Sequence, residues 1–241
     1  MGMKSKVGIG LALAASVALA GTAWAGPATV KTTPASIVIQ GSGNGPAGPV
    51  TLDQAYYVVK AKYQGEQYSM LQATYKVKLG GTDVEKNLVF VQSGAEVMSV
   101  FQNDRAQGQA SRALTFLVQA AGPYTIELLK PTALTGALQA PQTFKGGKGW
   151  MMTPLVKTKG NYVMLRLEWK GAVDANKKGG LPLASANLYD AETGDNWVRN
   201  QSVYNRNTKS DDGYTAKKPG VYFALVNCGK DGGSWEVSIL E

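Results

Sequence analysis

Short segments in which apolar and polar residues alternate make up most of the chain. Clusters of Gly, Pro, Asn and Asp separate them, for example at residues 41–46, 80–83 and 230–233. A period of two places successive side chains on opposite faces of a β-strand. No stretch after residue 25 keeps a helical period, so the crossover helices that a parallel sheet needs are not expected. The pattern predicts an all-β protein whose antiparallel sheets pack as sandwiches.

The chain after residue 25 is predicted to hold two copies of one unit. Residues 56–65 align with residues 162–171 without a gap. The inward positions of these segments correspond one by one: Tyr57, Val59, Ala61 and Tyr63 to Val163, Leu165, Leu167 and Trp169. Further matches follow in the same order: 39–41 with 144–146, 114–120 with 222–228, and 122–129 with 233–240. Three or more separated matches in one order indicate a duplicated unit.

The segment from Pro131 to Pro141 is the natural linker between the copies, because a proline bounds it at each end. We therefore predict two tandem antiparallel β-sandwich domains, jelly-roll-like in form, after a cleaved signal peptide. The predicted boundaries are 1–25 for the signal peptide, 26–130 for the first domain, 131–140 for the linker and 141–241 for the second domain. About 100 residues suffice for a seven- or eight-stranded sandwich with its own core.

The first 25 residues have the pattern of a secretory signal peptide. Lys4 and Lys6 precede an apolar run over residues 7–20, and an Ala-x-Ala sequence follows at residues 23–25. A membrane anchor is the alternative, but the apolar run is shorter than the roughly 20 residues needed to span a bilayer. The sequence predicts a periplasmic or secreted protein, cleaved between Ala25 and Gly26, with no transmembrane segment.

The composition excludes several kinds of chemistry. The chain has no His and one Cys, so it forms neither a Ser-His-Asp nor a Cys-His catalytic site. It offers no His ligand for zinc and no intramolecular disulfide. The 25 Lys and Arg residues outnumber the 17 Asp and Glu residues and give a net charge of +8. This charge is dispersed along the chain, so a nucleic-acid partner is not expected.

The second copy resembles the bacterial pre-peptidase C-terminal (PPC) domains and related jelly-roll sandwiches of secreted proteins. The segments that carry the resemblance are Phe144-Lys145-Gly146, Gly160-Asn161-Tyr162-Val163, Leu188-Tyr189-Asp190, Pro219-Gly220-Val221-Tyr222 and Gly233-Ser234-Trp235. It covers residues 141 to 241 well and the first copy weakly. The resemblance implies a secreted β-sandwich that serves as a binding or stability module.

Three acidic residues in one turn, Asp190, Glu192 and Asp195, are the candidate metal ligands. Carboxylates that alternate around a glycine suit Ca²⁺, which takes six to eight oxygen ligands. A polar hairpin turn has the same composition. Calcium is thus the one cofactor for which the sequence offers candidate ligands.

Four aromatic residues lie in polar, loop-like surroundings and are the candidate ligand-binding residues: Trp150, Trp197, Tyr204 and Tyr214. A flat exposed ring stacks on the apolar face of a sugar, and the same ring anchors protein interfaces. The alternative is that these rings cap the ends of the core. Trp197 and Tyr204 are expected to dominate, since the first copy offers Met98 and Phe101 at the corresponding place.

These observations predict an exported, non-enzymatic binding or assembly module for a glycan or a protein at the cell envelope. Residues 36–40, which precede a Gly- and Pro-rich stretch, are expected to offer a free sheet edge for strand addition or self-association. Two alternatives stay open: a structural subunit of an extracellular filament or surface layer, and a hydrolase that uses a pair of carboxylates.

Overall fold

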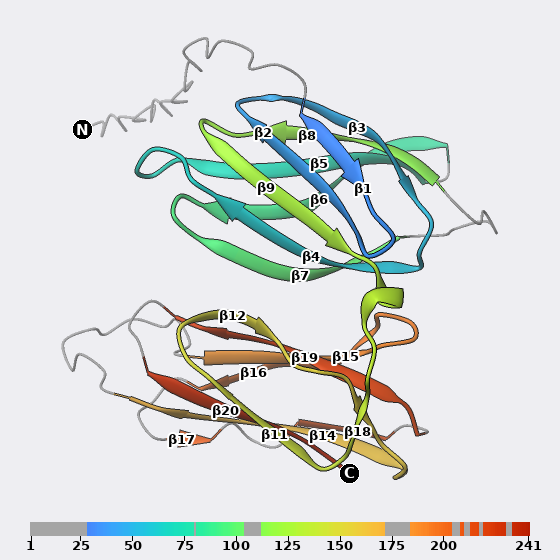
Figure 1. The fold of residues 1–241 in the computed structure, drawn as a ribbon, viewed down its shortest axis with the longest axis vertical. Coiled ribbons are helices and arrows are strands. Elements are labelled where there is room, and N and C mark those ends of the chain that lie inside the picture. Colours follow the sequence, from blue (N-terminus) through green and yellow to red (C-terminus); the bar gives the residue numbers. More distant parts are fainter. Residues whose placement is uncertain are drawn as a thin grey trace, which may run out of the picture.

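A computed structural model of the chain describes residues 28–79, 81–103, 112–171, 184–203, 208–209, 213–216, 219–229 and 233–241. Within these residues the strands pair antiparallel, apart from one two-residue parallel pair, and one 3-10 turn is present, η1 (Pro131–Ala133). The predicted all-β class of tandem antiparallel sandwiches is confirmed (Figure 1). The described part of the chain contains no helix long and apolar enough to cross a membrane. The predicted signal peptide, residues 1–25, lies outside it.

The strands up to Leu129 form two sheets that enclose one core, the N-terminal sandwich. One sheet has the order β1 (Thr29–Thr32), β2 (Ser36–Ser42), β9 (Pro123–Leu129), β4 (Tyr56–Tyr63) and β7 (Glu96–Gln102). The other has the order β3 (Gly45–Leu52), β8 (Arg112–Gln119), β5 (Met70–Leu79) and β6 (Thr82–Gln92). The core between them includes Ile39, Val59, Phe116 and Ile126, all fully buried.

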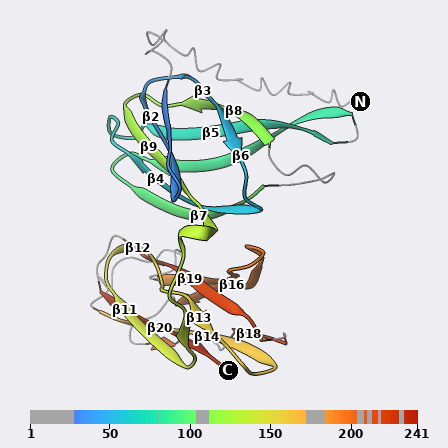
Figure 2. The ribbon, with the colours of Figure 1, turned by 45° about the vertical axis from the view of Figure 1, so that its right-hand side comes forward.

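The strands from Leu138 onward form the C-terminal sandwich, which Figures 1 and 2 show beside the first. One sheet has the order β10 (Leu138–Gln139), β13 (Val156–Lys157), β19 (Val221–Cys228), β15 (Ala184–Asp190) and β16 (Asn196–Val203), and β12 (Gly149–Met152) also pairs with β19. The other has the order β11 (Gln142–Gly146), β20 (Ser234–Leu240), β14 (Tyr162–Lys170) and β17 (Thr208–Lys209), and β18 (Gly213–Ala216) also pairs with β14. Strand β10 lies inside the linker predicted at 131–140. Whether each sandwich folds alone stays a prediction.

The two sandwiches repeat one strand order. The order β2-β9-β4-β7 of the N-terminal sandwich corresponds to β11-β20-β14-β18 of the C-terminal sandwich, and the order β3-β8-β5-β6 corresponds to β12-β19-β15-β16. The registers agree as well, because Tyr124 lies between Gly41 and Tyr63 just as Trp235 lies between Gly146 and Trp169. A Cβ at either glycine would collide with the neighbouring ring. Each copy therefore keeps a glycine where an aromatic ring lies across the adjacent strand.

Strand β1 has no counterpart among the described strands of the C-terminal sandwich. It pairs with β2 along Thr29–Thr32, while β9 pairs with the other edge of β2. The predicted free edge at residues 36–40 is therefore wrong. The short turn between the strands lets the chain fold back, since the Thr33 side chain accepts hydrogen bonds from the backbone N–H of Ala35 and of Ser36.

The outer faces of two sheets, one from each sandwich, pack against each other. Tyr56 of β4 is fully buried there, and its ring stacks on Phe223 of β19 at a centroid distance of 6.5 Å. Phe223 stacks in turn on Tyr189, at 5.4 Å. The other buried members of this cluster are Val58, Met98, Leu155 and Leu225. Because both faces are covered there, residues 56–59 of β4 and residues 221–226 of β19 read as uninterrupted apolar runs.

An ion pair within the N-terminal sandwich holds the residue that precedes the predicted linker in place. The Lys130 ammonium lies 2.9 Å from the Asp53 carboxylate, and the Tyr57 hydroxyl donates to the same carboxylate at 2.9 Å. Burial raises the pKa of the Asp53 carboxyl, but the hydrogen bonds from Lys130 and Tyr57 outweigh it and leave the pKa below its usual value. This ion pair ties the last residue before the predicted linker to the loop between β3 and β4.

We expect Tyr56→Ala to uncouple the two sandwiches. A buried aromatic side chain contributes about 3–5 kcal/mol to stability, and here the loss falls on the contact between the sandwiches. Differential scanning calorimetry should show one transition for the wild type and two for Tyr56→Ala. Tyr56→Phe is the matched control, because it removes only one hydrogen bond, at about 1 kcal/mol. A single, unshifted transition for Tyr56→Ala would contradict the expectation.

Candidate functional site

The predicted calcium turn holds the two sandwiches together in this structure. The Tyr56 hydroxyl donates a 2.7 Å hydrogen bond to the Ala191 carbonyl in that turn. Gly194, at φ +74°, lies directly against the Tyr56 ring, which leaves no room for a Cβ. Burial raises the pKa of the Tyr56 hydroxyl, and the nearby Asp190 carboxylate raises it further. The hydroxyl therefore stays protonated and remains a hydrogen-bond donor.

The three acidic side chains of the turn play different parts. Asp190 is buried, and its Oδ1 accepts hydrogen bonds from the backbone N–H of Glu192 at 2.8 Å and of Thr193 at 3.2 Å. Asp195 accepts a hydrogen bond from the Thr193 hydroxyl at 2.9 Å, and Glu192 is exposed. Among the described residues, no three Asp, Glu, His or Cys side chains form a group that could hold a metal. The geometry shows an Asp-capped turn.

The structure does not bring the four predicted aromatic residues together in one site. Trp197 is half-buried on β16 and packs against the C-terminal core, so it does not form the exposed loop surface that its polar neighbours predict. Its proposed counterparts were also misplaced, because Met98 and Phe101 lie on β7, which corresponds to β18 rather than to β16. Tyr204 lies outside the described residues. The backbone of Tyr214 lies in β18, opposite Met164.

Trp150 lies in a hollow between the sandwiches. It is half-buried on β12 and packs against the cluster around Tyr56. The hollow has a volume of about 490 Å³. The N-terminal sandwich contributes Phe90, Gln92 and Glu96, and the C-terminal sandwich contributes Lys148, Trp150 and Asn227. One aromatic ring from each sandwich thus lines this hollow together with amide and charged groups.

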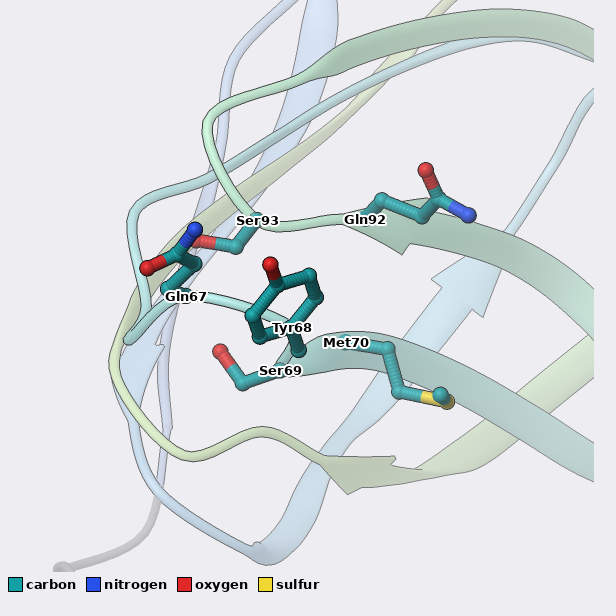
Figure 3. Close-up of a pocket in the computed structure, with 6 residues that line it drawn as sticks. All are labelled: Gln67, Tyr68, Ser69, Met70, Gln92 and Ser93. Carbon is teal, nitrogen blue, oxygen red and sulfur yellow. The ribbon is translucent and has the colours of Figure 1, made fainter.

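A second hollow, of about 580 Å³, lies at the end of the N-terminal sandwich where β4 connects to β5. Figure 3 shows the Tyr68 ring among Gln67, Ser69, Met70, Gln92 and Ser93. The Tyr68 side chain is 89% exposed. Gln92 lines this hollow as well as the one beside Trp150, so the two hollows are neighbours.

The loop holds Tyr68 in a conformation that costs free energy. Its φ of +67° makes it the one described residue other than glycine with a positive φ. A bulky residue in this region costs on the order of 1–3 kcal/mol. The surrounding hydrogen bonds impose it: the Tyr63 hydroxyl donates to Ser69 Oγ at 2.8 Å, and the Ser93 hydroxyl donates to the Gly65 carbonyl at 2.6 Å. Such strain is typical of residues that contact ligands.

The acidic side chain beside the hollows forms ion pairs with neighbouring lysines. Glu96 is paired with Lys62 at 3.0 Å and with Lys60 at 3.4 Å. Lys148 is exposed on the opposite wall. The polar groups nearest the Tyr68 ring are amides and hydroxyls, which both donate and accept hydrogen bonds.

Sequence reasoning missed Tyr68 and Phe90. Tyr68 stands in the polar segment Gly-Glu-Gln-Tyr-Ser, which meets the criterion that selected Trp150. Phe90 gives no such signal, because it lies between Val89 and Val91 and reads as part of a continuous apolar run. In the structure those valines point into the core and Phe90 points out, 48% exposed.

Comparison with known proteins identifies no family. No family profile and no curated protein sequence matches the chain. Among solved structures, the Cupin 2 conserved barrel domain protein from Leptotrichia buccalis aligns over 92% of this chain and 91% of its own, at 7% identity and a TM-score of 0.25. The CBM22-1–CBM22-2 tandem domain of Paenibacillus barcinonensis Xyn10C aligns over 84% and 86%, at 12% identity and a TM-score of 0.26. The CUB1-EGF-CUB2 domain of human MASP-1/3 aligns over 88% and 98%, at 6% identity and a TM-score of 0.24. Similarities this low carry no argument about function.

We expect Asp190→Ala to destabilise the protein equally with Ca²⁺ and with a chelator. The substitution leaves two backbone N–H groups of a partly buried turn without an acceptor, a loss of about 1–3 kcal/mol. Chemical denaturation in calcium and in EDTA measures it, with the exposed Glu192→Gln as the control that changes a neighbouring acid. A wild-type stability that rises with calcium, and no longer rises in Asp190→Ala, would instead show a calcium site.

Proposed function

We propose that this chain is an exported, non-enzymatic carbohydrate-binding protein, which holds an extended sugar chain along the two hollows from Tyr68 to Trp150. The observation that carries the proposal is the strained, exposed Tyr68 in a hollow that shares Gln92 with a second aromatic-lined hollow. The strained backbone of Tyr68 is not offset by packing of its side chain, since the residue is 89% exposed. A ligand that stacks on the ring accounts for it.

The residues around these rings suit sugar hydroxyl groups. Gln67, Gln92 and Asn227 carry amides, and Ser69 and Ser93 carry hydroxyls. Each of these groups both donates and accepts hydrogen bonds, as a sugar hydroxyl does. Phe90 and Trp150 supply further flat apolar surface for the next sugar rings. A binding site of this kind has a few polar groups that orient the ligand against aromatic walls.

A hydrolase that uses a carboxylate pair is the weaker candidate. Such an enzyme needs two acids that face each other across the bound sugar. Among the described residues that line the two hollows, Glu96 is the one acid, and two lysines neutralise it. The arrangement favours binding over hydrolysis.

Export and the resemblance of the second copy to PPC domains fit the same proposal. A signal peptide at residues 1–25 would place the protein where it meets polysaccharides of a cell envelope or of the surroundings. A PPC-like module would serve binding, and the duplication adds the second wall of the hollow at Trp150.

We expect Tyr68→Ala and Trp150→Ala each to weaken polysaccharide binding by about 1–3 kcal/mol, the range for central aromatic contacts. Affinity electrophoresis in gels that contain soluble β-glucan, xylan, mannan or peptidoglycan fragments measures binding directly. Tyr162→Ala is the matched control, because Tyr162 is a tyrosine 46% exposed on β14 of the other sandwich. Retention of the wild type by none of these polymers, or equal weakening by Tyr162→Ala, would contradict the proposal.

Tyr68→Gly separates the ligand contact from stability. Glycine adopts a φ of +67° at little cost, so this variant should lose binding while its melting temperature stays equal or rises. A fall in melting temperature together with the loss of binding would show that Tyr68 supports the loop and not the ligand.

We expect the exported protein to begin near Gly26. N-terminal sequencing of the protein from the periplasm or the medium gives the first residue. Met1 at the N-terminus of that fraction would contradict export by a cleaved signal peptide.

A further inference from the structure

The open edge of β11 stands where the N-terminal sandwich carries its extra strand. In the described part of the chain, β11 pairs with β20 alone, whereas its counterpart β2 pairs with both β9 and β1. The registers make Phe144 the counterpart of Ile39, because each lies two residues before the glycine that faces the aromatic ring. Ile39 is fully buried in the core beside Val30 of β1, and Phe144 is only half-buried. The missing strand therefore leaves an apolar side chain partly uncovered.

The sequence of β11 matches that of the strand that covers the equivalent edge. Strand β1 contains Thr29-Val30-Lys31, and β11 contains Thr143-Phe144-Lys145. In the N-terminal sandwich Val30 lies opposite Ile39 and packs against the core, while Thr29 lies opposite Gln40 and Lys31 opposite Val38. A second β11 laid antiparallel on the first would repeat this pattern, with Phe144 in the place of Val30.

We infer that two copies of this chain associate through β11, antiparallel and two-fold symmetric, with Phe144 opposite the partner's Phe144. In this register Lys145 lies opposite the partner's Thr143, so the two lysines do not face each other. Each Lys145 also keeps its ion pair with Glu236, at 2.9 Å. The contact is isologous and self-complementary, which closes the assembly at two copies. It joins two sheets into one and covers both phenylalanines.

The backbone groups of β11 are available for this pairing. On β2, the Lys130 N–H donates to the Ala35 carbonyl and the Thr33 N–H donates to the Ser36 carbonyl, both at 2.8 Å. Because the direction of these groups alternates along a strand, Val38 and Gln40 direct theirs toward β1. Their counterparts on β11 are Thr143 and Lys145. The N–H of Thr143 therefore faces the open edge and is not needed by β20.

The first test removes the backbone N–H of Thr143. Sedimentation velocity across a concentration series should show reversible dimerisation of the wild-type chain. Thr143→Pro removes an edge N–H, which a folded monomer tolerates on an edge strand, and should give a monomer with an unchanged melting temperature. Thr143→Ala is the matched control: it loses the same side-chain contact with Ser238 but keeps the N–H, and should still dimerise. A wild type that stays monomeric at its solubility limit, or a Thr143→Pro variant that dimerises as the wild type does, would overturn the inference.

The second test fixes the register. In a Cys228→Ala background, Phe144→Cys should form a covalent dimer on mild oxidation, because directly opposed residues of a non-hydrogen-bonded pair have Cα atoms about 4.5 Å apart, within disulfide range. Thr143→Cys should not, since it faces Lys145 of the partner subunit. Equal cross-linking of the two variants, or none of Phe144→Cys, would overturn the register and with it the proposed contact. Neither test depends on sugar binding, so its outcome leaves the proposed function to be judged separately.

Discussion

The packing of Tyr56 against the C-terminal sandwich is the contact on which the rest of the structure depends. Its ring lies on Phe223 and against Gly194, and its hydroxyl reaches the Ala191 carbonyl. This arrangement brings the end of β6 close to β12, and the hollow beside Trp150 takes a wall from each side. Without the contact, Trp150 would lie on an open sheet face. The hollow beside Trp150 therefore belongs to neither sandwich alone.

Strand positions, fold class and duplication were all predictable from the sequence, because they follow from local alternation. The segments around Tyr63 and Trp169 match at every inward position, and the structure places the two residues in equivalent cross-strand rows, one in each sandwich. The contact between the copies was not predicted. The uninterrupted run from Val221 to Val226 does signal a strand covered on both faces, but such a run does not say which surface covers it.

Trp150 and Trp197 show why the site could be predicted only in part. Both stand among polar residues in the sequence, yet one lines a hollow and the other packs against the core. Trp150 lies on β12, which pairs with the distant strand β19, whereas Trp197 lies on β16 at an irregularity in its pairing with the preceding strand β15. The acidic turn is a further example. The sequence could not show that Asp190 accepts hydrogen bonds from the backbone of the turn that receives Tyr56, and calcium binding there stays a prediction.

Cys228, the one cysteine of the chain, lies in the wall of the hollow beside Trp150. Its thiol is buried, and burial raises its pKa. Alkylating reagents attack the exposed thiolate, so modification has to wait until the strands around β19 separate. The rate of thiol labelling therefore reports how often this part of the molecule opens. Cys228 is thus a native labelling site that reports local opening without any engineered cysteine, and a molecule bound in the hollow would lower its labelling rate.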